Sequence, residues 1–491
     1  MSVEYSQAKG CFVNSFRANL EYSITEDERI VAYFGNKTAL LEETLNSHRF
    51  AISLNPTNTD ILFNAAQVLT SLAEASLESG TQDTKKGTAR EWLEEAVQIF
   101  TRCLENQQRE YEQMQAEIAK AQASGEYQEA WEGGVSLNTA QADEEEAETA
   151  SSSSEAPGDW ATVEEPLTPE TILETCTAQL GALTTLLGLY DPSDLANIEK
   201  KAHDGTDTAT AKIPALINLI DTTPSRTVKD ESKAGPTLSL GSSAIEEVTT
   251  TPKDDAILAT ANFQSTLAEV SYRSASSEST QYAQTIEQIF SRISASTENP
   301  ASSELAVANI HSSYADALID LASALANGTQ YAPSSPTFAT DVEIQWTALT
   351  QAQALLTQLA AAPYTSVLSA SRLADIFLAR GDVDLSRFRI GLFESAKPAW
   401  VKSRSVLVGN GGVFYRGART YAEKAGAMEV RLTADAKAIV AEVLKAVAGG
   451  EKEGKAHWKG RSVDVGKVLE QMVEEGVVGR ENVEGILLAV N

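Results

Sequence analysis

A spacing of apolar residues by three, four and three positions recurs along this 491-residue chain and is clearest after residue 345. Four residues show it there: Leu349, Ala352, Leu356 and Leu359. Side chains spaced in this way share one face of an α-helix. Pro363 is expected to end this helix, because proline cannot continue a helical hydrogen-bond ladder. An apolar face must be buried against another element, so the pattern predicts helices that pack on one another.

Two further helices are predicted immediately after Pro363. The first carries Leu373, Ala374 and Phe377. Gly381 and Asp382 are expected to form the turn that ends it. The third helix repeats the spacing at Val383, Ser386, Ile390 and Phe393. The stretch therefore predicts a pair of antiparallel helices joined by a short glycine-containing turn.

The same spacing occurs near the N-terminus, in three successive predicted helices. Their apolar positions are Leu41, Thr44, His48 and Ala51, then Leu62, Ala65, Ala66, Leu69 and Ala73, then Leu93, Ala96, Phe100 and Cys103. Pro56 lies between the first two helices and is expected to separate them. Helices joined by such short connections pack as antiparallel neighbours.

The order of large, small and aromatic residues in both regions resembles the tetratricopeptide repeat (TPR), a 34-residue helix-turn-helix unit. The resemblance covers residues 36–110 and 345–396. The spacing of the TPR pattern is kept better than its residue types. Ala73 stands where glycine is usual, and Thr44 and Ser386 stand where alanine is usual. These units are therefore TPR-like and degenerate.

The resemblance implies a concave groove, lined by the first helix of each repeat, that holds a peptide or a helix. The residues it places there are Asn64, Gln67, Arg372 and Asp375. Family members that bind Hsp70 or Hsp90 clamp a terminal carboxylate with Lys, Arg and Asn. Asn64 matches that clamp, but no Lys or Arg accompanies it nearby in the sequence.

The chain is predicted to be all-α, a TPR-like α-solenoid of antiparallel helix pairs with long insertions, because no stretch alternates with period two long enough to require a sheet. Composition divides it into five regions. They are helical repeats at 1–125, an acidic linker at 126–165, helices at 166–221, a Ser/Thr/Pro-rich loop at 222–255 and helical repeats at 256–491. Thr168 is the predicted N-cap of the third region, with Pro169 at the first helical position.

The linker at 126–165 contains no Lys or Arg and is predicted to be disordered, since it cannot bury enough apolar surface to offset its ordering entropy. Its most acidic part comprises Asp143, Glu144, Glu145, Glu146 and Glu148. Two interpretations remain open for this acidic arm. It is either a solvated linker or an arm that captures a basic client protein.

The formal net charge of −30 predicts a surface that repels nucleic-acid phosphates and anionic lipids and attracts basic proteins, although such a charge also simply promotes solubility. Residues 387–470 depart from this, with sixteen Lys and Arg against nine Asp and Glu. Three roles are open for this basic segment. It docks on the acidic part of the same chain, it binds an anionic partner such as RNA, or its charges are merely solvated.

No catalytic, cofactor or metal motif is evident. His48, His203, His311 and His457 lack metal-ligand spacing, and Cys11, Cys103 and Cys176 are too scattered for a zinc site and fit buried positions. Gly449, Gly454 and Lys455 approach a phosphate-loop spacing, but Ala456 replaces the Ser or Thr and a helix is predicted in place of the strand. Gly409-Asn410-Gly411-Gly412 is expected to form a turn between helices.

No secretory leader and no apolar run of membrane-spanning length is evident, so a cytosolic or nuclear protein is expected. The leading hypothesis is a non-enzymatic TPR-like adaptor or dedicated escort or assembly chaperone. Its partner would be a basic protein segment, such as that of a ribosomal or nuclear protein, with no small-molecule substrate. The alternatives are a scaffold subunit of a larger complex, an RNA-associated protein acting through 387–470, and an enzyme with a scattered site.

Overall fold

The computed structural model describes residues 37–78, 83–124, 167–222, 250–297, 303–328, 331–449, 458 and 460–490. Over these ranges all regular secondary structure is helical, which confirms the all-α prediction there. The elements are α3 (Lys37–Leu54), α4 (Thr59–Glu78), α5 (Asp83–Ser124), α7 (Pro169–Leu189), α8 (Leu195–Asp207), η1 (Thr208–Lys212), α9 (Ile213–Thr222), α10 (Pro252–Arg273), α11 (Ser279–Thr297), α12 (Glu304–Ala326), α13 (Phe338–Leu359), η2 (Tyr364–Ser366), α14 (Ala370–Gly391), α15 (Pro398–Ala425), α16 (Met428–Ala448), α17 (Ser462–Glu474), η3 (Arg480–Asn482) and α18 (Val483–Val490).

Most of the predicted linker at 126–165 and of the loop at 222–255 lies outside the described residues. The acidic arm of Asp143, Glu144, Glu145, Glu146 and Glu148 lies outside them as well. Their predicted disorder therefore stays a prediction.

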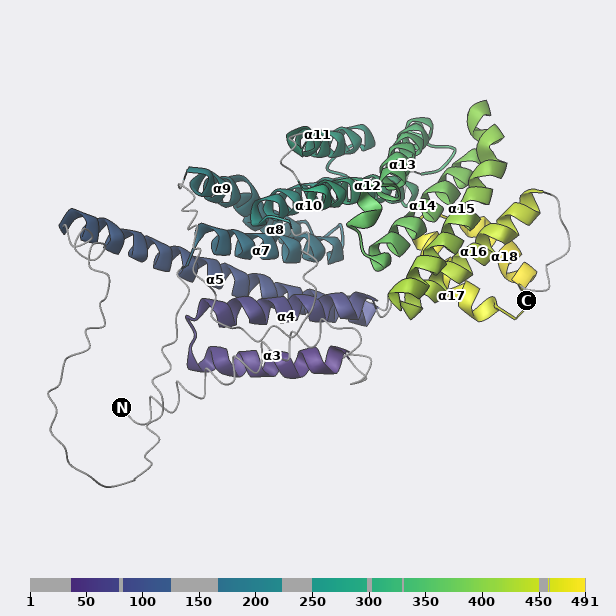
Figure 1. Ribbon diagram of the computed structural model, residues 1–491. Helices are drawn as coiled ribbons and strands as arrows, with labels where there is room; N and C mark the ends of the chain where they lie inside the picture. Colours follow the sequence, from purple (N-terminus) through teal and green to yellow (C-terminus); the bar gives the residue numbers. More distant parts are fainter. Residues whose placement is uncertain are drawn as a thin grey trace, which may run out of the picture.

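The helices form a solenoid from α3 to α18 in which most long helices pack on their neighbours along the chain, while α7 packs mainly on α5 and α10 (Figure 1). Three apolar cores follow one another along the stack. The first joins α3 to α5 with α7 to α10, the second joins α10 to α14 with Trp400 of α15, and the third joins α14 to α18. Because α10 and α14 each contribute to two cores, neighbouring cores share a helix, and the stack is continuous.

Short polar side chains define the starts of several helices. Thr168 caps α7 by accepting a hydrogen bond from the Thr171 amide, with Pro169 at the first helical position, as predicted. Thr251 and Pro252 repeat this arrangement at the start of α10. These caps position α7 and α10, which carry the first core.

A π-helical turn, η1, connects α8 to α9 and allows proline within a continuous helical run. Pro214 is the second residue of α9, just beyond η1, and lacks the backbone N–H that an α-helix would use at that position. A wider π turn relieves the clash of the proline ring with the preceding turn. Thr208 of η1 is fully buried and donates a hydrogen bond to Gln179 of α7, which fixes the direction of α9.

Two predicted turns are wrong, because both lie inside helices. Gly381 and Asp382 are in the middle of α14, so residues 370–391 form one helix in place of the predicted pair. Gly409-Asn410-Gly411-Gly412 lies within α15. Gly381 has a packing role, since a Cβ atom there would overlap the ring of Tyr415 on α15. These glycines permit close contact between helices, which sequence spacing alone cannot distinguish from a turn.

The contact between α14 and α15 also holds a buried ion pair. Lys437 of α16 is 3% exposed and donates to both carboxylate oxygens of Asp382 at 2.9 Å. Tyr415 donates a hydrogen bond to the same carboxylate at 2.8 Å. Burial disfavours the charged ammonium, but the negative charges of Asp382 and Glu475 outweigh it and raise the pKa of Lys437. The pair therefore ties three helices together.

Replacing Gly381 with alanine should lower stability by about 2 kcal/mol, because the new methyl group must displace the Tyr415 ring in a close-packed contact. Gly409 is a matched control in the next helix, where the nearest atom to an added Cβ would be Lys445 Nζ at 3.8 Å. Gly409→Ala should raise stability by about 0.5–1 kcal/mol through helix propensity. Thermal unfolding measures both changes, and equal effects of the two substitutions would contradict the packing role of Gly381.

Candidate interaction surface

Five carboxylates from four parts of the solenoid lie close enough to influence one another. They are Glu269 of α10, Asp316 and Asp320 of α12, Asp375 of α14 and Glu475 at the end of α17. The negative charge of Asp375 acts on Asp316, and those of Glu269, Asp316 and Glu475 act on Asp320. We call these five residues the carboxylate row.

Four carboxylates of the row, Asp316, Asp320, Asp375 and Glu475, have raised pKa values. Partial removal of water by surrounding protein, together with neighbouring negative charge, raises the pKa of Asp316 to about 6 and that of Asp320 to about 7. Both side chains are nevertheless solvent-exposed. Water therefore reaches the carboxylates from one side while protein encloses them on others, which is the environment of a recessed surface.

Few cations neutralise the row. Arg273 forms an ion pair with Glu269 at 2.6 Å, and the charge of Arg372 acts on Asp316 and Asp375. Arg372 itself donates to Asn309 of α12 at 2.7 Å. Lys437 of α16, which also pairs with Asp382, lies 3.8 Å from Glu475. Three cations therefore face five carboxylates, and the row keeps a negative excess when it is ionised.

The end of α17 is held against α12 by backbone contacts. Asn327, which follows α12, donates to the carbonyl oxygen of Glu474 at 2.7 Å. Arg389 of α14 donates to the carbonyl oxygen of Gly476 at 2.7 Å. These bonds place Glu475 beside the row, although it is 155 positions after Asp320 in the sequence.

The predicted groove residues fall into two separate places. Asn64 and Gln67 lie on α4 and are half-buried, beside the first core. Arg372 and Asp375 lie in the first turns of α14, together with Asp316 of α12. Asp375 thus belongs to the carboxylate row and Arg372 lies beside it, whereas nothing places Asn64 and Gln67 next to it. Sequence reasoning missed Glu269, Asp316, Asp320 and Glu475, since only folding brings them together.

The basic segment forms many ion pairs within the C-terminal part of the chain. Arg416 pairs with Glu442, and Arg419 and Arg461 both pair with Asp435. Other pairs leave the segment, from Lys397 to Glu343 and from Lys437 to Asp382 and Glu475. Much of its positive charge is therefore used in contacts with neighbouring helices.

Three of the potential catalytic side chains in the described ranges are buried. Cys103 and Cys176 are buried, as predicted, and burial raises the pKa of each thiol to about 12, which disfavours a nucleophilic thiolate. His48 is fully buried in α3. Cys11 and His457 lie outside the described residues. Across the described ranges, no group of three or more metal-ligating side chains is present.

One described helix, α7, has the length and apolar composition of a membrane span. More than half of that helix is buried inside the protein, where it supplies much of the first core. Burial of this kind is typical of a core helix in a helical stack.

No family model matches the chain, and no curated protein matches it. One solved structure found by similarity of fold is described as a circular tandem repeat protein with novel repeat topology and enhanced subunit contact surfaces. The two chains share 13% sequence identity, and the alignment covers 99% of this chain and 89% of that one, with a TM-score of 0.30.

The raised pKa of Asp320 gives stability a defined pH dependence. Because folding raises this pKa from 3.8 to about 7, the folded chain binds the proton more tightly, and stability falls as pH rises through that interval. Asp320→Asn should therefore raise the thermal unfolding midpoint above about pH 7, and the gain should shrink toward about pH 4. Glu470→Gln, at another exposed position, is the control. A gain of equal size at both pH values would argue against this electrostatic origin.

Proposed function

We propose that this protein is a non-enzymatic helical repeat protein that binds a basic segment of a partner protein on the carboxylate row. The observation that carries the proposal is the negative excess of the row, in which Asp316 and Asp320 remain exposed but insufficiently neutralised. Lys or Arg side chains of a partner would supply the missing positive charge. Their approach would also lower the raised pKa values, which links binding to loss of protons.

The TPR-like spacing supports the same type of function. Stacked helix pairs offer an extended surface on which a peptide or a helix can lie. An adaptor or a dedicated escort or assembly chaperone in the cytosol or nucleus, with a ribosomal or nuclear protein as client, fits a net charge of −30. We favour this over an RNA-associated role because cations such as Arg416 and Arg419 already pair with acidic residues.

The test uses the full chain and an unstructured Lys/Arg-rich peptide as probe. Neutralising four carboxylates of the row, with Glu269→Gln, Asp316→Asn, Asp320→Asn and Asp375→Asn, should weaken binding about tenfold, since each exposed pair contributes about 0.2–1 kcal/mol. Wild-type affinity should fall from about 50 mM to about 500 mM salt through screening. It should also fall below about pH 7 as Asp320 gains its proton. Isothermal titration calorimetry measures all three effects.

Two further variants test whether binding depends on the carboxylate row itself or only on the overall negative charge of the chain. Glu199→Gln, Glu304→Gln, Glu429→Gln and Glu470→Gln remove the same charge from exposed positions elsewhere and should change affinity little. The second of these variants neutralises the five residues of the acidic arm. If only that arm variant loses binding, or if the two charge-matched variants lose it equally, the row is not the binding surface.

A further inference from the structure

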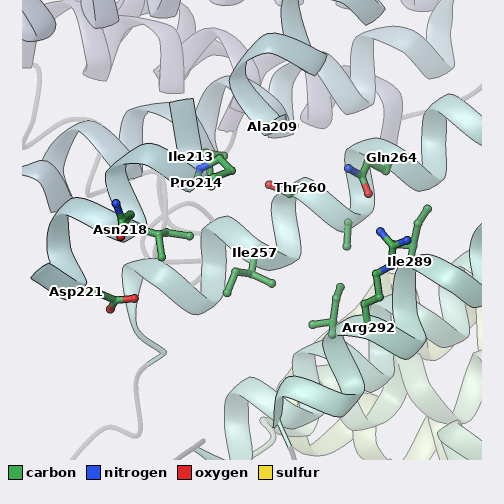
Figure 2. A pocket seen from close by; sticks show the side chains of 13 residues that line it. Ala209, Ile213, Pro214, Asn218, Asp221, Ile257, Thr260, Gln264, Ile289 and Arg292 are labelled. Atoms are coloured by element: carbon green, nitrogen blue, oxygen red, sulfur yellow. The ribbon is translucent and has the colours of Figure 1, made fainter. Parts of the chain in front are cut away.

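A groove runs along α10 between α9 and α11 (Figure 2). Its first part has a volume of about 400 Å³, and five of its thirteen lining residues are isoleucines from the three helices. A second part of about 370 Å³ continues toward the turn between α10 and α11. Gln264, Ile289 and Arg292 line both parts, so the two form one continuous groove.

The floor of the groove is one face of α10. Its residues recur every three or four positions: Ile257, Thr260, Ala261, Gln264, Leu267, Ala268 and Ser271. Fourteen positions at 1.5 Å rise give a floor about 21 Å long. Several of these side chains are small, so the backbone of another helix can come close. The length corresponds to about four helical turns.

The groove leaves apolar surface uncovered. Ile217 of α9, Ile257 of α10 and Ile289 of α11 are only half-buried, although all three line the same groove. On this side of the stack α11 packs against α13, whereas the groove separates α9 from α11 (Figure 1). A contiguous apolar patch with a polar rim is typical of a docking site.

Arg292 gives the groove a charge preference. It is exposed, lies at the wall formed by α11, and no carboxylate within the described part of the chain pairs with it. In Figure 2 its guanidinium group extends toward Gln264 across the groove. The other charged lining residue, Asp221, already forms an ion pair with Lys253 at 2.8 Å. An occupant would therefore gain most from a carboxylate placed at Arg292.

We propose that this groove binds one amphipathic helix of a partner protein, with its apolar face on the isoleucines and an acidic side chain opposite Arg292. A helix fits better than an extended peptide, because the floor and both walls are helices and the groove takes the place of a further helix between α9 and α11. The charge preference of the groove is set by Arg292 and is opposite in sign to that of the carboxylate row.

The first test is a charge swap on the full chain. The probes are capped amphipathic helical peptides that differ only in carrying Glu or Lys at the centre of one edge. Wild type should bind the Glu peptide about tenfold more tightly than the Lys peptide, and Arg292→Glu should reverse that order. Arg480→Glu, which makes the same charge change at another exposed position, should leave the order unchanged. Equal binding of the two peptides, or no binding of either, would overturn the proposal.

A second pair of variants tests the apolar face. Ile257→Asn should weaken both peptides about tenfold, whereas Val463→Asn, at an apolar position exposed elsewhere, should not. Circular dichroism confirms that the variants fold.

A photo-crosslinking residue placed at position 257 of the full chain in cells identifies the natural occupant. A captured helix from another protein, with an apolar stripe and an acidic residue, supports the site. Capture of this chain's own residues or of a second copy overturns it.

Discussion

The solenoid depends on contacts in which an aromatic ring of one helix lies directly on a glycine of another. Phe263 of α10 lies on Gly205 of α8, and Tyr415 of α15 lies on Gly381 of α14. In the reverse direction, the ring of Phe377 on α14 would be 2.7 Å from a Cβ at Gly417 of α15. Without a Cβ at these positions, the helix axes can approach closely enough for rings to fill the space between them, and dispersion contacts increase accordingly.

This close approach also makes the buried charges tolerable. Tyr415 can donate to Asp382 because Gly381 leaves room for its ring, and Lys437 completes the group from α16. A buried carboxylate with one partner missing would be strongly destabilising, since its lost hydration would not be replaced. The packing of the Tyr415 ring on Gly381 and the ion pair between Asp382 and Lys437 are therefore parts of one contact between helices. The ammonium group of Lys437 also lies 3.8 Å from Glu475. Lys437 therefore contacts both the buried Asp382 and one residue of the carboxylate row.

Periodicity in the sequence predicted most helices well, because an apolar face has to be buried whatever its partner is. Thr168 and Pro169 even fixed the start of α7. Glycine was the main source of error, since Gly381 and Gly411 give the same local sequence signal whether a glycine ends a helix or lies against a neighbouring helix. Of the five residues of the carboxylate row, the sequence analysis named only Asp375. Arg372 and Asp375 came from the TPR-like spacing, but Asp320 meets Glu475 only through contacts between α12 and the end of α17.

The contrast between Asp382 and the carboxylate row supports the proposal that the row is a binding surface. Asp382 is neutralised inside the chain by Lys437 at 2.9 Å and by a hydrogen bond from Tyr415. Asp320 has no comparable partner on α12, so burial and the negative charges of its neighbours raise its pKa. If the row served only to hold helices together, a cation next to Asp320, like Lys437 next to Asp382, would remove the electrostatic cost of ionising Asp320. Groups that stay electrostatically unfavourable while exposed to solvent are characteristic of binding surfaces, where the missing charge arrives with the ligand.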